Sequence, residues 1–243
     1  MGTISPWSPE DRERRKREIT EISNRDGIGI AIRTAFGGLP YIGSAITELV
    51  NVWIPNSSFE RLVDFSLDIG EAMATLQPRI NPEYLRTEGG AFVLRSILDG
   101  VATTYQKEKL EAFRAFFLNS MLSENTNQEK KEILLRIVND LTYSHIKVLK
   151  LLDSPARFVA DRGIAYPAPY PPIPGSAMQI LGTCLPELDE AIISVLWGDI
   201  SSLGLVTGEP NSLRGLGSST ALDQLFNRLT PFGRDFVKFI KMP

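Results

Sequence analysis

The chain has 243 residues, of which 43% are hydrophobic and 23% charged, and its formal net charge at pH 7 is −3. Its length allows one large domain or two domains of ordinary size, and the slight negative charge excludes a global attraction to nucleic acid or anionic membranes. With one cysteine (Cys184) and one histidine (His145), the chain has no internal disulfide and lacks the ligand set of a structural zinc site. We expect no metal and no cofactor.

Residues 1–26 are predicted to form a charged helical arm. Ser8 suits an N-cap, Pro9 suits the first turn, and the acidic residues that follow favour the positive end of the helix dipole. Six positive and six negative side chains in this stretch indicate a solvated arm rather than one that binds nucleic acid. The arm lacks the apolar core of a signal peptide, so we expect a cytoplasmic protein.

Residues 27–55 are apolar, rich in small residues and interrupted by Gly-Gly-Leu-Pro at 37–40. The longest uncharged run, 34–47, has 14 residues, fewer than the roughly 18 that a spanning helix needs. Two short helices that meet at this turn are predicted. They form either a buried hairpin of the core or a hairpin that inserts into a membrane upon activation. The residues that would enter the membrane are Ile42, Ala45 and Ile46.

Helical spacing of apolar residues predicts a helix over 57–76 and a pair of helices over 83–122. Core candidates in this pair include Phe92, Leu94, Phe113 and Phe116. The polar segment 123–128 marks the predicted domain boundary. Residues 27–125 are therefore expected to form a helical domain, and residues 126–243 a second domain.

The second domain has the element order of a winged helix across about 140–240. A helix over 129–141 is followed by one that Thr142 caps, a proline-rich extended loop at 167–175, and a long helix over 186–203 with Ile192 and Val195 among its core residues. Gly204 then suits a turn with positive φ, and a hydrophilic hairpin near 205–229 precedes a helix capped by Thr230. The fold class is thus predicted to be all-α, with a short β-hairpin wing as its only strands.

A DNA-reading helix carries Arg, Lys, Asn or Gln where it meets the groove. No Arg or Lys occurs from Pro186 to Leu203, and the wing supplies one cation, Arg214. The stretch begins instead with the acidic residues Glu187, Asp189 and Glu190, which repel phosphate. We therefore expect a protein-interaction surface here rather than a DNA-binding surface.

The proline-rich loop carries two tyrosines, Tyr166 and Tyr170. Tyrosines on a stiff loop supply contact area at low entropic cost, so they are candidate interface anchors. We expect a homo-oligomer or a complex with a protein partner.

Catalytic motifs are not found in the sequence. Neither GxGxxG nor GxxxxGK[ST] occurs. His145 falls within an amphipathic helix, which favours a structural histidine, and Cys184 lies in an apolar stretch typical of a buried small hydrophobe. No catalytic residues are predicted, and the protein is not expected to be an enzyme.

Four segments carry a resemblance to a known family: TEGGAFVLRSILDGVATTYQKEKLEAFRAFFLNSML, LTYSHIKVLKLLD, DISSLGLV and LTPFGRDFVKFI. Over about residues 83–240 the chain resembles the abortive-infection alpha family, in which a helical region precedes a similar C-terminal ending. The resemblance implies a prokaryotic or phage origin and a part in anti-phage defence, and it supplies no catalytic residues. The leading hypothesis is a non-enzymatic interaction protein of a bacterial anti-phage or signalling system. The alternatives are a membrane-acting effector that uses 27–55 and a winged-helix DNA-binding regulator.

Overall fold

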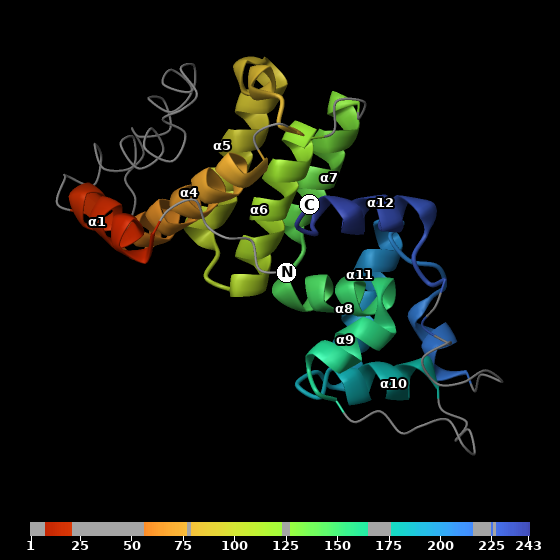
Figure 1. Ribbon diagram of the computed structural model, residues 1–243. Coiled ribbons are helices and arrows are strands. Elements are labelled where there is room, and N and C mark those ends of the chain that lie inside the picture. The colour runs from red at the N-terminus through yellow and green to blue at the C-terminus, as the bar shows by residue number, and fades with distance from the viewer. Residues whose placement is uncertain are drawn as a thin grey trace. The chain divides into compact units, whose positions relative to one another are not determined.

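The computed structural model describes residues 8–20, 56–76, 79–122, 127–164, 176–215, 225 and 227–243. These residues are mostly helical (Figure 1), and no strand occurs among them. The predicted all-α class is confirmed. The apolar hairpin predicted over 27–55 and the extended loop predicted over 167–175 lie outside the described residues.

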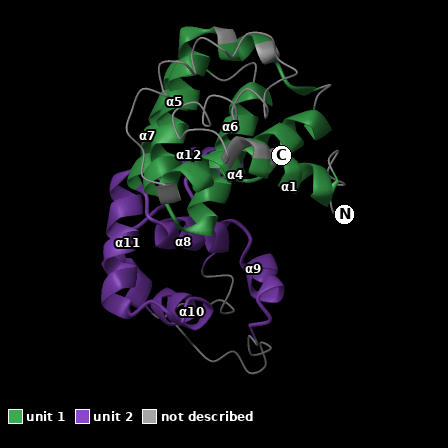
Figure 2. Cartoon of the chain, turned by 90° about the vertical axis from the view of Figure 1, so that its left-hand side faces the viewer, with its two compact units in different colours: residues 1–140, 239–243 green, residues 141–238 purple. Residues whose placement is uncertain are grey.

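The chain forms two compact units, shown in different colours in Figure 2. Unit 1 comprises residues 1–140 and 239–243, and unit 2 comprises residues 141–238. The change of unit thus comes later in the chain than the boundary predicted after residue 125. The reason is that helix α7 (Gln128–Asp140) packs against α5 (Glu88–Thr103) and α6 (Lys107–Leu122) of unit 1.

The other described elements of unit 1 are α1 (Pro9–Thr20), α4 (Asn56–Leu76) and the 3-10 helix η2 (Pro82–Arg86). Helices α5 and α6 contact each other, and both contact α4, α7 and η2, so together they form the centre of the described part of this unit. The side chains of Phe113, Phe116 and Phe117 on α6 are fully buried. Because α6 has neighbours on several sides, its apolar residues do not follow a single stripe.

The end of the chain packs on α6. The side-chain amide of Asn119 donates hydrogen bonds to the carbonyl oxygens of Phe239 (3.0 Å) and Lys241 (2.7 Å). The ring of Phe239 lies 5.3 Å from that of Phe116, centroid to centroid. These contacts explain why residues 239–243 belong to unit 1.

Helix α1 is held on α4 by ion pairs. Arg12 pairs with Asp68 and, at 3.4 Å, with Glu71, while the ammonium group of Lys16 lies 2.8 Å from a carboxylate oxygen of Asp64. None of the α1 side chains that the structure describes is buried. The hydroxyl oxygen of Ser8 accepts a hydrogen bond from the backbone N–H of Asp11 at 3.1 Å, as expected of an N-cap. Among its described side chains, the arm is therefore attached to α4 by ion pairs.

The described elements of unit 2 are α8 (Tyr143–Asp153), α9 (Pro155–Asp161), α10 (Ala177–Cys184), α11 (Glu190–Ser202), η3 (Pro210–Arg214) and α12 (Pro231–Phe239), whose last residue is counted with unit 1. Trp197 of α11 is fully buried, and its indole N–H donates to the carbonyl oxygen of Gly208 at 2.8 Å. Thr142 and Thr230 precede α8 and α12 as predicted, and the Thr230 hydroxyl accepts from the backbone N–H of Gly233 at 2.8 Å.

Three details of the helices predicted for unit 2 are wrong. Helices α9 and α10 were not predicted, because each is short and borders the proline-rich stretch. Helix α11 begins at Glu190 rather than near residue 186, because Asp189 caps it. Ile192 and Val195 are 45% and 63% exposed, since the buried stripe of α11 follows other residues: Ile193, Leu196, Trp197 and Ile200.

The expected wing is not formed by the described part of 205–229. A single antiparallel bridge pairs Val206 with Leu229. Backbone hydrogen bonds flank it, from Thr207 N–H to the Arg228 carbonyl (2.8 Å) and from Thr230 N–H to the Leu205 carbonyl (3.0 Å). The 3-10 helix η3 follows the first of these segments. Gly204 has φ of +71°, which confirms the predicted left-handed turn.

Candidate functional site

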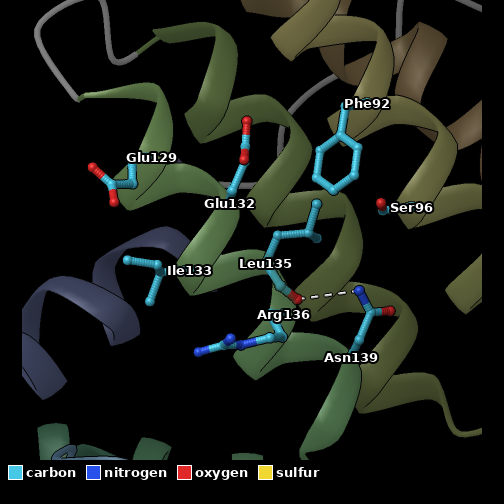
Figure 3. Close-up of a pocket in the computed structure, with 8 residues that line it drawn as sticks. All are labelled: Phe92, Ser96, Glu129, Glu132, Ile133, Leu135, Arg136 and Asn139. Atoms are coloured by element: carbon cyan, nitrogen blue, oxygen red, sulfur yellow. Dashed lines mark hydrogen bonds between the residues drawn. The ribbon is translucent and has the colours of Figure 1, made fainter.

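A groove of about 410 Å³ runs over α5 and α7 of unit 1 (Figure 3). Helix α5 contributes Phe92 and Ser96. Helix α7 contributes the rest of the lining: Glu129, Glu132, Ile133, Leu135, Arg136 and Asn139. We call this set of residues the α5–α7 groove.

Phe92 was predicted to be a core residue, and this prediction is wrong. The buried face of α5 consists of Gly90, Val93, Leu94, Ile97, Leu98 and Val101. Phe92 lies beside that face, is 49% exposed, and its ring points toward Leu135 of α7 (Figure 3). An aromatic ring left half in water beside a hollow is a feature typical of binding sites.

One edge of the groove is ordered by a relay of hydrogen bonds. The Tyr84 hydroxyl donates to Gln128 Oε1 at 3.1 Å, and Gln128 Nε2 donates to Glu132 Oε1 at 2.9 Å. Burial raises the pKa of Tyr84 to about 12; the Gln128 hydrogen bond opposes this rise, and the Glu132 carboxylate adds a smaller increase. Tyr84 therefore stays a neutral donor, and the relay restrains the Glu132 carboxylate at the groove.

The outward face of α7 carries an acidic, an apolar and a basic residue in that order. Glu129 and Arg136 are exposed and lie seven residues apart, which is two helical turns, so they share one face. Ile133 lies between them and is 38% exposed. Within the part of the chain that the structure describes, neither Glu129 nor Arg136 forms an ion pair. Both charges are thus available to a partner.

A second cluster lies in unit 2 and consists of Thr142, His145 and Asp199. Its side chains contact one another in the order of the nucleophile, base and acid of a catalytic triad. His145 Nδ1 lies 2.8 Å from the Thr142 hydroxyl, and Nε2 lies 3.2 Å from Asp199 Oδ2. The backbone N–H of Thr142 also donates to Nδ1, at 3.1 Å. Nδ1 has a single lone pair, so the hydroxyl shares it with the backbone N–H of the helix cap. His145 is 5% exposed and serves as part of the cap of α8.

The acidic residues singled out from the sequence have local structural roles in unit 2. Glu187 accepts a hydrogen bond from Lys147 at 2.9 Å. Burial alone would raise the pKa of Glu187, but the Lys147 hydrogen bond, its own backbone N–H and nearby cations lower it overall. Asp189 caps α11 by accepting from the backbone N–H of Ile192 at 2.7 Å, and Glu190 is exposed in the first turn. Arg214 is exposed at the end of η3.

The remaining predicted site residues lie outside the described part of the chain. These are the loop tyrosines Tyr166 and Tyr170 and the membrane candidates Ile42, Ala45 and Ile46. Cys184 is buried, as its sequence context indicated.

Two further kinds of site are absent from the described residues. Over those residues no group of three or more His, Cys, Asp or Glu side chains is placed to hold a metal ion. None of the helices in the described segments combines the length and apolar character of a bilayer-spanning segment.

Comparison with known proteins yields no relative of this chain: no family model, curated protein or solved structure gives a significant match. Within the described residues, the α5–α7 groove combines exposed apolar groups with charges that form no ion pair there.

Proposed function

We propose that this protein is a non-catalytic interaction protein whose α5–α7 groove binds an amphipathic helix of a protein partner. The observation that carries the proposal is the exposure of Phe92 and Ile133, at 49% and 38%, beside a hollow of about 410 Å³. Covering large apolar side chains stabilises a complex by about 25 cal/mol per Å² of apolar surface removed from water.

The charges around the groove specify what the partner helix presents. Helix-in-groove recognition uses apolar anchors spaced three, four and seven residues apart. Glu129 and Glu132 lie at the N-terminal side of α7 and favour a basic residue there, whereas Arg136 favours an acidic residue further along. The partner therefore carries an apolar stripe with a base at one end and an acid at the other.

Several finer predictions from the sequence stay proposals. The pairing of Val206 with Leu229 supports a winged-helix-like arrangement of 140–240, because it joins the two segments that flank a wing. The acidic N-cap of α11, Asp189, and the acidic first-turn residue Glu190 support a protein partner over DNA. The roles in anti-phage defence and in membrane insertion through 27–55 stay predictions, as does the cytoplasmic location.

Selection from a displayed peptide library tests the proposed groove. Peptides of about 18 residues, long enough for about five helical turns, are selected on the wild-type protein, and the affinity of the best one is measured by fluorescence anisotropy. We expect Phe92→Asp to weaken binding by about tenfold or more, because the charge enters an apolar contact. Tyr105→Asp is the matched control, since Tyr105 is 77% exposed outside the groove.

Circular dichroism and thermal melting establish that both variants remain folded, which their exposed positions favour. The proposal fails if no selected peptide loses affinity for Phe92→Asp relative to Tyr105→Asp. It is supported if the selected sequences share the apolar stripe with a base and an acid at its ends.

A further inference from the structure

We infer that the helix bound at the α5–α7 groove is α7 of a second copy of this chain, in an antiparallel arrangement. This inference rests on the proposed function and names the partner of the same site. Its basis is the order of three residues on one face of α7: Glu129, Ile133 and Arg136.

The charges on this face are complementary to those of a second copy of the helix that runs in the opposite direction. A two-fold axis brings the same patch of both copies into contact. Each contact between two different residues therefore occurs twice. With antiparallel helices and an axis near Ile133, Glu129 of each copy approaches Arg136 of the other. Glu129 precedes Ile133 by four residues and Arg136 follows it by three, so both charges lie at nearly equal distances from the axis.

The charges also exclude the opposite alignment. Parallel helices in register would place Glu129 beside Glu129 and Arg136 beside Arg136, and like charges at such distances repel. The two ion pairs of the antiparallel form are made by side chains that have no ion-pair partner within the described part of their own chain. Forming them therefore breaks no ion pair there.

The apolar groups of the groove supply the attraction. The two Ile133 side chains meet near the axis, and Phe92 on α5 flanks them with a half-exposed ring. Helix α7 has 13 residues and is about 20 Å long, so the contact is at the lower end of the areas found in stable interfaces. We therefore expect a reversible dimer with a dissociation constant in the micromolar range.

Charge reversal tests this arrangement by analytical ultracentrifugation of the full chain. Glu129→Arg and Arg136→Glu should each raise the dissociation constant by about tenfold or more, because each change converts two attractive contacts into two repulsive ones. The double variant exchanges the charges and should return the constant to within about threefold of wild type. Both positions are exposed, so the variants retain the fold, which circular dichroism checks.

Disulfide trapping provides a second measurement. Ile133→Cys, near the axis, should give a disulfide-linked dimer under mild oxidation, while Tyr105→Cys should not. The natural thiol, Cys184, is buried and does not interfere. Tyr170→Ala addresses the interface predicted from the sequence and should leave the dimer unchanged.

Three results would overturn the inference. One is a wild-type protein that is monomeric at about 100 μM, far above the expected dissociation constant. The others are a double variant whose dissociation constant does not return toward that of the wild type, and a dimer that is lost in Tyr170→Ala but is insensitive to the charge reversals. If the wild type is monomeric while selected peptides still require Phe92, only the self-association is wrong and the proposed groove stands. If the affinity of those peptides does not depend on Phe92 either, both proposals are wrong.

Discussion

The ammonium nitrogen of Lys131 lies 4.1 Å from the centroid of the Tyr84 ring and donates a 2.8 Å hydrogen bond to the carbonyl oxygen of Ser120. Lys131 is 4% exposed and forms no ion pair with a carboxylate in the described part of the chain. The ring face and the carbonyl dipole stabilise the cation, yet burial still lowers the pKa of Lys131 below its ordinary value of 10.5.

This lowered pKa makes the contribution of Lys131 depend on pH. Between the folded and unfolded pKa values the unfolded chain binds more protons, so the free energy of unfolding rises with pH in that window. We therefore expect the stability of the wild type to improve relative to Lys131→Met as pH rises from 7 to 10.5, as urea denaturation of both proteins measures. A stability difference that stays constant over this range would contradict the prediction.

Cys184 is 1% exposed, and burial raises the pKa of its thiol from 9.0 to about 11. We expect a thiol reagent at pH 8 to label it only after urea unfolds the protein. Because the unfolded thiol ionises first, the free energy of unfolding should fall as pH rises from 9 to 11, by about 2 kcal/mol. In Cys184→Ala, the decrease in the free energy of unfolding between pH 9 and pH 11 should be smaller by this amount. Rapid labelling of the folded wild type would contradict the burial of the thiol.

The charged attachment of α1 to α4 should be sensitive to salt. At 1 M salt the screening length is about 3 Å, and each partly exposed pair contributes only about 0.5 kcal/mol. We expect hydrogen exchange of α1 to accelerate in high salt while α5 stays protected. Lys16→Asp should have the same effect at low salt, and adding Asp64→Lys should reverse it. Equal acceleration in both helices would indicate general unfolding instead.

Two glycines on helices should respond oppositely to alanine. A Cβ atom at Gly233 of α12 would overlap the carbonyl oxygen of Leu205, whereas one at Gly182 of α10 would meet nothing within 4 Å. We expect Gly233→Ala to lower the free energy of unfolding by about 2 kcal/mol or more, because backbone must move. Gly182→Ala should raise it by about 0.5 to 1 kcal/mol through helix propensity. Thermal and urea denaturation measure the free energy of unfolding of both variants. Equal changes in the two variants would contradict the close packing of Gly233 against Leu205.

The sequence by itself determined most helices and their caps. Thr142 before α8, Thr230 before α12 and the turn at Gly204 lie where their residue types predicted. Capping depends on a side chain and backbone groups two or three residues away, so local sequence is sufficient information. The predicted core positions of Phe113 and Phe116 are also confirmed, since both side chains are fully buried.

The tertiary structure decided which faces are covered. Phe92 and Phe113 are the same residue type on neighbouring helices, yet one is 49% exposed and the other is fully buried. The burial of Lys131 and the contact of His145 with Asp199 likewise join residues from different helices. Such features depend on the rotation of each helix against neighbours far along the chain. The periodicity of one segment indicates its apolar stripe but not which neighbour covers each side chain, so the groove depends on the packing of α5 beside α7.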